Sequence, residues 1–406
     1  MKTEQFPARH ETRELPRSAL AALRDIPGLI AGPLSPLARI AAADATPDTT
    51  LLVAALDAMP GVWSACPAAL IDPGLSLAVI VADRRVQQSG QYVWADACGR
   101  GPGFRVEAKT AVVEVTGPIH LEELEELLLE RLSPAGVATP EPVRLQLDAA
   151  AVWGLLALVD AHGTASLIRE AARADGPLPA LQRRDLQESW QLGLSRPNPG
   201  WAVSMAALLA PDLLPTSADA ALVGMSALEE AGLLTPLAGT PDDPLGELLL
   251  PGGVLELLCD GLGRQSIRLG LLRMERSGPA ELQIIRVMVW RLAGGYVLLD
   301  LSALAEDRAE LLLFGASRML ELLGEMLGIQ QDAASLPAAP TPTPVELRKA
   351  LMQVATASSP AVQPRILATP RPSPASPTSS GPRYCSQCGA EVNDAARFCG
   401  SCGARL

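Results

Sequence analysis

Four cysteines near the C-terminus constrain this chain more than any other feature. Cys385 and Cys388 form one C-x2-C pair, and Cys399 and Cys402 form a second pair after ten intervening residues. A two-residue gap lets two thiolates on one tight turn reach the same ion, and two such turns complete the tetrahedron that zinc accepts from sulfur ligands. The spacing therefore predicts one Zn²⁺ ion held by these four cysteines. Four thiolate ligands leave no open position on the metal, so the predicted site is structural and not catalytic.

The residues beside the cysteines also match between the two pairs. Gly389 and Gly403 follow the pairs, and Tyr384 and Phe398 precede them. With these features the last 24 residues, 383–406, resemble a short bacterial zinc-ribbon domain. The resemblance implies two zinc knuckles that face one another with the metal as their core. So small a segment buries too little apolar surface to fold alone, and metal binding contributes about 10–16 kcal/mol in comparable sites.

Three other interpretations of the four cysteines fit less well. Two disulfides would suit a secreted protein, and nothing in the sequence indicates secretion. A thioredoxin-like redox pair requires a strand followed by a helix, which this segment lacks. Rubredoxin-type iron uses the same knuckles, but that fold surrounds the metal with more residues and more aromatic side chains. Structural zinc is the interpretation that the spacing favours.

The composition changes at about residue 333. From there to residue 382 prolines recur among alanine, serine and threonine, and large apolar residues are sparse. Such a segment buries too little to offset its ordering entropy, which predicts a disordered linker. Within it, Val345–Thr356 could form a short amphipathic helix, either as a docking helix or as a helical fragment without a role. The predicted parts of the chain are residues 1–140, 141–332, 333–382 and 383–406.

The body before residue 333 contains two stretches with similar patterns. Each predicts three closely spaced strands with glycine-marked turns and then one closing helix, so we expect an α+β fold of two halves with antiparallel meanders. A long helical segment precedes the second set of strands. The expected strands lie near 75–83, 91–97, 104–115, 265–275, 281–292 and 296–301. The expected helices lie near 120–132, 148–174, 179–193, 199–209, 217–231, 245–262 and 306–327.

The net charge of −12 is unevenly distributed. From residue 333 onward seven bases and three acids give +4, so residues 1–332 carry −12 − 4 = −16. An acidic body repels nucleic acid and anionic membrane surfaces. The first residues show no apolar run or cleavage pattern, and the most apolar internal run, Ala149–Val159, is too short to span a bilayer. We therefore expect a cytoplasmic protein without a membrane span.

Few residues of the body resemble a catalytic or cofactor-binding site. No G-x-S-x-G or phosphate-binding P-loop motif is present, so we predict that the protein is not an enzyme. The histidines are far apart in the sequence. The glutamates of the predicted helix 120–132 lie opposite a stripe of leucines, a pattern typical of a helix with one solvated face and one buried face. The other cysteines are typical of small core residues. These residues are His10, His120 and His162; Glu122, Glu123, Glu125, Glu126 and Glu130; Cys66, Cys98 and Cys259.

One segment, residues 216–237, resembles part of a winged helix-turn-helix. A DNA-binding version needs basic side chains for the phosphates. Residues 197–263 contain no Lys, Arg or His and nine acids, which disfavours nucleic acid as a partner. A patch assembled from nearby arginines would reverse that conclusion. These arginines are Arg264, Arg268, Arg273 and Arg276.

The function predicted from the sequence is a non-enzymatic cytoplasmic adaptor that binds protein partners. One alternative is a chaperone for an exported protein, because helices and antiparallel strands in two related halves are weakly similar in layout to the substrate chaperones of type VII secretion. Another alternative is a transcription-associated regulator that uses residues 216–237 and the zinc ribbon. The identity of the partner and the oligomeric state do not follow from the sequence.

Overall fold

A computed structural model of the chain describes much of the body and two short strands near the C-terminus. The chain separates into two compact units, residues 1–358 and residues 359–406. The predicted linker 333–382, with its segment Val345–Thr356, lies outside the described residues. The described residues are 10–24, 34–37, 48, 50–51, 54–55, 61–83, 87–109, 112–132, 142–173, 181–196, 198–217, 219–237, 248–252, 255, 258–259, 267–278, 281–292, 295–329, 383–384 and 391–392.

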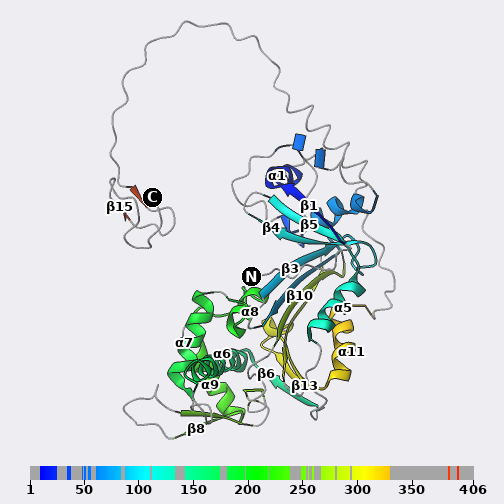
Figure 1. The fold of residues 1–406 in the computed structure, drawn as a ribbon. Helices are drawn as coiled ribbons and strands as arrows, with labels where there is room; N and C mark the ends of the chain where they lie inside the picture. The colour runs from blue at the N-terminus through cyan, green and yellow to red at the C-terminus, as the bar shows by residue number, and fades with distance from the viewer. Residues whose placement is uncertain are drawn as a thin grey trace, which may run out of the picture. The chain divides into compact units, whose positions relative to one another are not determined.

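A ten-stranded antiparallel sheet forms the centre of the body (Figure 1). Its strand order is β1-β5-β4-β3-β2-β10-β11-β12-β13-β6. Helices cover both faces of this sheet, so the predicted α+β class is confirmed. The strands are β1 (Glu11–Pro16), β2 (Leu75–Ala82), β3 (Gln87–Trp94), β4 (Gly103–Ala108), β5 (Val112–Ile119), β6 (Val143–Leu147), β10 (Arg268–Arg276), β11 (Leu282–Arg291), β12 (Tyr296–Asp300) and β13 (Ala309–Phe314).

The two halves of the body join where β2 pairs with β10. On each side of this joint four strands follow one another in chain order, β2 to β5 and β10 to β13. An earlier strand of the same half pairs with the last member of each set. Strand β1 pairs with β5, and strand β6 pairs with β13. One helix then follows each set, α5 (Leu121–Leu132) or α11 (Ala316–Leu327). The halves therefore share one sheet and repeat one order of elements.

Four predicted segments contain other elements than expected. The expected strand 104–115 is two strands, β4 and β5, and the expected helix 306–327 is strand β13 followed by α11. Each half therefore contributes four consecutive strands and not three. The expected helices 179–193 and 245–262 each contain a short strand, β7 (Leu181–Gln182) and β9 (Leu248–Pro251). Local patterns failed here because short leucine-rich runs suit a helix and a buried strand equally well.

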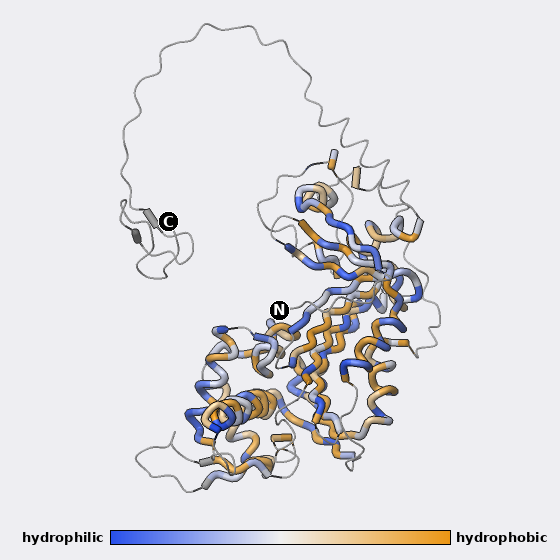
Figure 2. The backbone as a smooth tube through the Cα atoms, in the orientation of Figure 1, coloured by the Kyte–Doolittle hydropathy of each residue, from blue (hydrophilic) through white to orange (hydrophobic). Residues whose placement is uncertain are grey.

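Three clusters of buried side chains define the layers. Helices α5 and α11 cover one face of the sheet, over strands from both halves. On the opposite face one group of helices covers the first half, and another group covers the second half. Figure 2 shows the apolar residues concentrated between these layers. The helices of the opposite face are α1 (Arg17–Arg24), η1 (Gly61–Ala65), α4 (Cys66–Ile71), α6 (Ala149–Ala171), α7 (Arg183–Ser195), α8 (Ala202–Leu209) and α9 (Ala220–Glu230). A short 3-10 turn, η3 (Leu304–Glu306), precedes β13.

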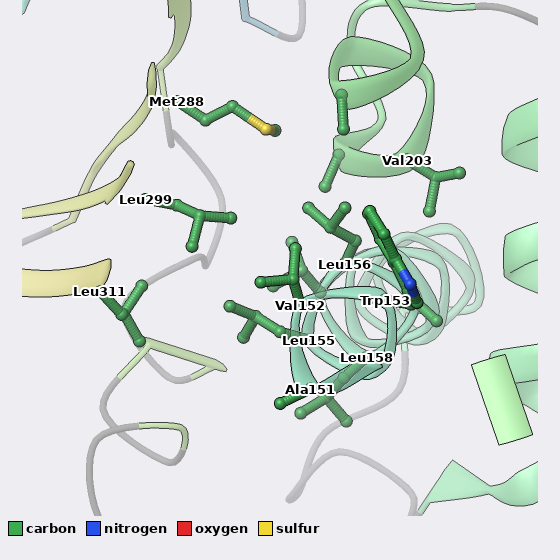
Figure 3. Packing of buried hydrophobic residues seen from close by; sticks show 14 of the residues in the cluster. Ala151, Val152, Trp153, Leu155, Leu156, Leu158, Val203, Met288, Leu299 and Leu311 are labelled. Atoms are coloured by element: carbon green, nitrogen blue, oxygen red, sulfur yellow. The ribbon is translucent and has the colours of Figure 1, made fainter. Parts of the chain in front are cut away.

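Helix α6 is the centre of the second-half core. Its N-terminus is capped by Asp148, whose carboxylate accepts a hydrogen bond of 2.7 Å from the Ala151 N–H. Val152 and Leu155 point toward Leu299 of β12 and Leu311 of β13 (Figure 3). Among the described residues α6 is the one helix long and apolar enough to cross a bilayer, and most of its apolar window is buried in the body.

A second, small sheet lies within the helical part of the second half. Its strand order is β7-β9-β8, where β7 is Leu181–Gln182 and β8 is Leu234–Leu237. Helix α9 precedes β8, and Gly232 between them has a φ of +68°. Glycine adopts this left-handed conformation without the steric cost of a side chain, so it ends the helix as the sequence predicts.

Helices α6 and α9 touch at a pair of glycines. A Cβ atom added to Gly154 would lie 2.4 Å from the carbonyl oxygen of Gly224 and 2.5 Å from its carbonyl carbon. Both obstacles are backbone atoms, which cannot rotate away. Gly163 lies on the same helix, and a Cβ atom there would meet nothing closer than 3.7 Å.

We expect Gly154→Ala to lower the free energy of unfolding by about 1–3 kcal/mol, because the added methyl group forces the two helices apart. Gly163→Ala is the matched control and should raise it by about 0.5–1 kcal/mol, since alanine is the better helix former where space exists. Urea denaturation of the two variants beside the wild type measures both values. Equal effects of the two substitutions would contradict the proposed helix contact.

Candidate functional site

The predicted metal ligands lie in a segment of which the structure describes one short hairpin. Strands β14 (Arg383–Tyr384) and β15 (Glu391–Val392) pair antiparallel, with Tyr384 opposite Glu391. Cys385 and Cys388 therefore fall in the connection between two paired strands, where a zinc knuckle belongs. The four cysteines themselves lie outside the described residues. Their chemistry fits zinc, because all four donors are thiolates.

The three cysteines among the described residues, Cys66, Cys98 and Cys259, form no disulfide. Cys66 in α4 is fully buried, and burial raises the pKa of its thiol to about 12. Cys259 is also buried, whereas Cys98 is half-buried in the turn after β3. Burial, the largest cause, and the carboxylate of Asp96 raise the pKa of the Cys98 thiol. The raised pKa values of Cys66 and Cys98 keep both thiols protonated, which disfavours a nucleophilic role for either.

The histidines and glutamates singled out in the sequence do not assemble into a site. His120 precedes α5, and its backbone N–H donates to the Glu123 carboxylate at 2.9 Å. His162 is buried on α6, and the two lie on different elements from His10. The glutamates of α5 lie on its outer face, while its leucines face the sheet. No group of three or more metal-binding side chains occurs within the described ranges.

Helix α9 occupies the position of the helix expected in residues 216–237. Its inner face, which includes Gly224 and Leu228, is buried. Its outer face is a stripe of exposed residues with two carboxylates and no base. This composition offers no cation to a phosphate backbone. The stripe consists of Asp219, Val223, Ser226 and Glu230.

The arginines that could form a basic patch are engaged within the body. Arg273 is 2% exposed, lies against Glu275 and donates to the Met326 carbonyl at the end of α11. Arg276 forms two hydrogen bonds with the carboxylate of Asp72. Arg268 is buried beside Asp160. Arg264 lies outside the described residues, and Arg268, Arg273 and Arg276 present no basic patch.

The most unusual polar group of the body is Asp160, in the middle of the apolar helix α6. Its side chain is fully buried, and burial raises its pKa to about 6, against the opposing effects of Arg268 and two backbone N–H groups. Those N–H groups belong to Ala202 and Val203 and donate at 2.6 and 2.9 Å. The Arg268 guanidinium lies 3.5 Å from the same carboxylate. The only sequence signal of this cluster is an aspartate that interrupts an apolar run.

Comparison with known proteins identifies the C-terminal segment. A family model for the zinc-ribbon domain matches residues 384–406, which include all four cysteines. A search of curated proteins found no match to the chain. The last residues are thus a zinc-ribbon domain, as the spacing of the cysteines predicts, and a zinc-ribbon domain implies bound zinc.

Proposed function

We propose that this protein is a non-enzymatic cytoplasmic adaptor. Its acidic α+β body binds one protein partner, and its zinc ribbon, carried at the end of the proline-rich segment 333–382, engages another. One Zn²⁺ ion held by the four cysteines supplies the fold of the ribbon and takes no part in a reaction. The observation that carries the proposal is the zinc-ribbon match at residues 384–406.

The chemistry of the ribbon supports recruitment over catalysis. Four thiolates saturate a tetrahedral metal, so no position remains for water or substrate. What such a module can offer is a small rigid surface on a long tether. The sequence from residue 333 to 382 is rich in proline and poor in large apolar residues. Tethers of this composition let two modules reach partners at variable separation.

The described part of the body supports the same conclusion. Its buried charged groups hold structural elements together, as Asp160 and Arg268 do. A cavity beneath α5, lined by Tyr92, Arg105 and Leu128 among others, has a volume of about 20 Å³. That volume suits one water molecule.

Affinity capture from a cell lysate tests the adaptor proposal. The intact chain is compared with a Cys385→Ser/Cys388→Ser variant and with residues 1–332 alone, each with and without nuclease. The proposal expects two sets of proteins, one retained by all three baits and one that requires the intact ribbon. If all three baits captured the same proteins, the ribbon would have a structural role only and would recruit no partner. Capture that nuclease abolishes would favour the transcription-associated regulator.

A second candidate function is a chaperone for an exported protein. The specific observation in its favour is the body itself, in which two halves of the same element order share one antiparallel sheet. Partners that bind residues 1–332, carry export signals and are absent from the cytoplasm at steady state would favour the chaperone. Partners that stay in the cytoplasm would favour the adaptor.

A further inference from the structure

The ten-stranded sheet has two edge strands, which occupy equivalent places in the two halves of the body. Among the described strands, β1 pairs with β5 alone and β6 pairs with β13 alone. Figure 1 shows β6 beside β13 at the end of the sheet. The outward side of an edge strand carries backbone N–H and C=O groups that the sheet itself does not use. Each edge is therefore a template on which a further strand can pair.

The edge at β1 has features that discourage such pairing. Its side chains are mostly polar, since Glu11, Thr12 and Glu14 are exposed. Arg13 forms an ion pair with Glu11 on the same strand. The strand ends at Pro16, which has no N–H group to donate. Charged side chains and proline are the means by which natural edge strands avoid association.

The edge at β6 has a different composition. Its five residues alternate between apolar and polar side chains, and none of them is acidic or a proline. Val143 and Leu145 are half-buried against the core of the second half, and Leu147 is buried. Arg144 and Gln146 are exposed on the other side of the strand. The apolar side chains of β6 thus continue the core to the last strand of the sheet.

The single charge of β6 is balanced by the neighbouring strand. Arg144 forms an ion pair with the carboxylate of Glu310 in β13. The side-chain amide of Gln146 donates to the same carboxylate at 2.8 Å. Glu310 therefore orients both polar side chains of the edge strand and offsets the charge of the arginine. The edge lacks the unbalanced charge that would repel a second strand.

The sequence of β6 is self-complementary in an antiparallel pairing. With a two-fold axis at Leu145, this residue faces its own counterpart, and Val143 faces Leu147 of the second copy. Residues that face one another lie on the same side of a sheet, so the apolar side chains of the two strands form one row. Arg144 faces Gln146 of the second copy, which opposes no like charges.

We propose that β6 is the contact of a two-fold symmetric dimer of this chain, in which two β6 strands pair antiparallel and join two ten-stranded sheets. Such a contact uses the same surface on both copies, so the assembly closes at two chains. The two halves of one chain already join in this way, because β2 and β10 pair antiparallel. The dimer contact belongs to the body and does not depend on the zinc ribbon or on the adaptor function.

Analytical ultracentrifugation of the full-length protein across micromolar concentrations tests the proposal. The wild type should show a reversible equilibrium between monomer and dimer. Gln146→Lys should raise the dimer Kd by about 2–30-fold, because the introduced lysine faces Arg144 of the second copy at two places. Within one chain the same lysine lies beside the Glu310 carboxylate, so the body should stay folded.

The matched control is Thr12→Lys, which adds the same charge to an exposed position of the other edge, β1. It should leave the dimer Kd unchanged. A wild type that is monomeric at every concentration would overturn the proposal. An effect of Thr12→Lys without an effect of Gln146→Lys would do the same. Loss of the dimer in the Cys385→Ser/Cys388→Ser variant would place the contact in the ribbon instead.

Cysteine cross-linking tests the register of the pairing. Facing residues of antiparallel strands have Cα atoms about 4.5–5.5 Å apart, which a disulfide can span. Leu145→Cys should therefore form a disulfide between two copies under mild oxidation, identified by mass spectrometry of the joined peptide. Val143→Cys should form none, because residue 143 faces residue 147 of the second copy. Cross-linking at position 143 and not at position 145 would contradict the two-fold axis at Leu145.

Discussion

Residues 1–140, produced without the rest of the chain, should show no cooperative unfolding transition. The physical reason is the joint between the halves. Strand β2 pairs with β10 from Leu75 to Ala82, so removal of the second half turns a central strand into an unprotected edge. The cluster beneath α5 and α11 would also lose its side chains from β10 to β13. A fragment that cannot complete its core loses all of a net stability of about 5–15 kcal/mol.

Two polar contacts across the joint strengthen this expectation. The hydroxyl of Tyr296 in β12 donates to the Leu132 carbonyl at the end of α5, at 2.6 Å. Arg276 of β10 pairs with Asp72, which precedes β2. Both contacts join residues of different halves, so the fragment loses both.

The measurement is thermal and urea denaturation followed by near-ultraviolet circular dichroism. Residues 1–332, which keep both halves, are the control and should retain one sharp transition. Co-expression of residues 1–140 with residues 141–332 should restore it, because the missing strands return. A sharp transition in residues 1–140 alone would show that the half is an independent domain, against the shared core described above.

Helices of the second half could be predicted from local sequence because their signals are local. Helix α6 begins after Asp148, an N-cap residue, and α9 ends just before Gly232, whose φ is positive. The limits of α6, α8 and α9 agree with the expected ranges to within three residues. Caps and 3.6-residue periodicity need no knowledge of distant elements.

Other features could not be predicted because their causes are not local. The turn between β4 and β5 is closed by a hydrogen bond of 2.9 Å from Lys109 N–H to the Val112 carbonyl, in a sequence without glycine or proline. The η3 turn before β13 ends at Asp307 with a φ of +60°, a conformation that aspartate adopts less often than glycine. The pairing of β2 with β10 follows from the burial of two distant patterns against each other, which no window of sequence contains.

The zinc site could be predicted from the sequence, whereas the buried Asp160–Arg268 pair could not. The zinc ligands could be predicted because C-x2-C spacing is itself the geometry of the site. Asp160 and Arg268 lie far apart in the sequence, and only the fold brings them to 3.5 Å. This pairing leaves no motif in the sequence.

Replacement of Cys385 and Cys388 by serine should abolish zinc binding. The wild type should hold one zinc ion per chain after purification without added metal, and the variant less than about a tenth of that. Two thiolates remain in the variant, and they cannot complete a tetrahedral site, so most of a binding free energy of about 10–16 kcal/mol is lost. Inductively coupled plasma mass spectrometry measures the metal content.

The control is Cys98→Ser, a half-buried cysteine outside the ribbon, which should keep the full zinc content. Free-thiol titration of the denatured chain separates zinc from disulfides. Zinc-bound cysteines become reactive once a chelator removes the metal, whereas disulfide-bonded cysteines stay unreactive until a reductant is added. Zinc retained by the double variant, or lost from Cys98→Ser, would contradict the assignment of the four ligands. Because the ribbon belongs to a compact unit separate from the body, the unfolding transition of residues 1–332 should persist in the zinc-free variant.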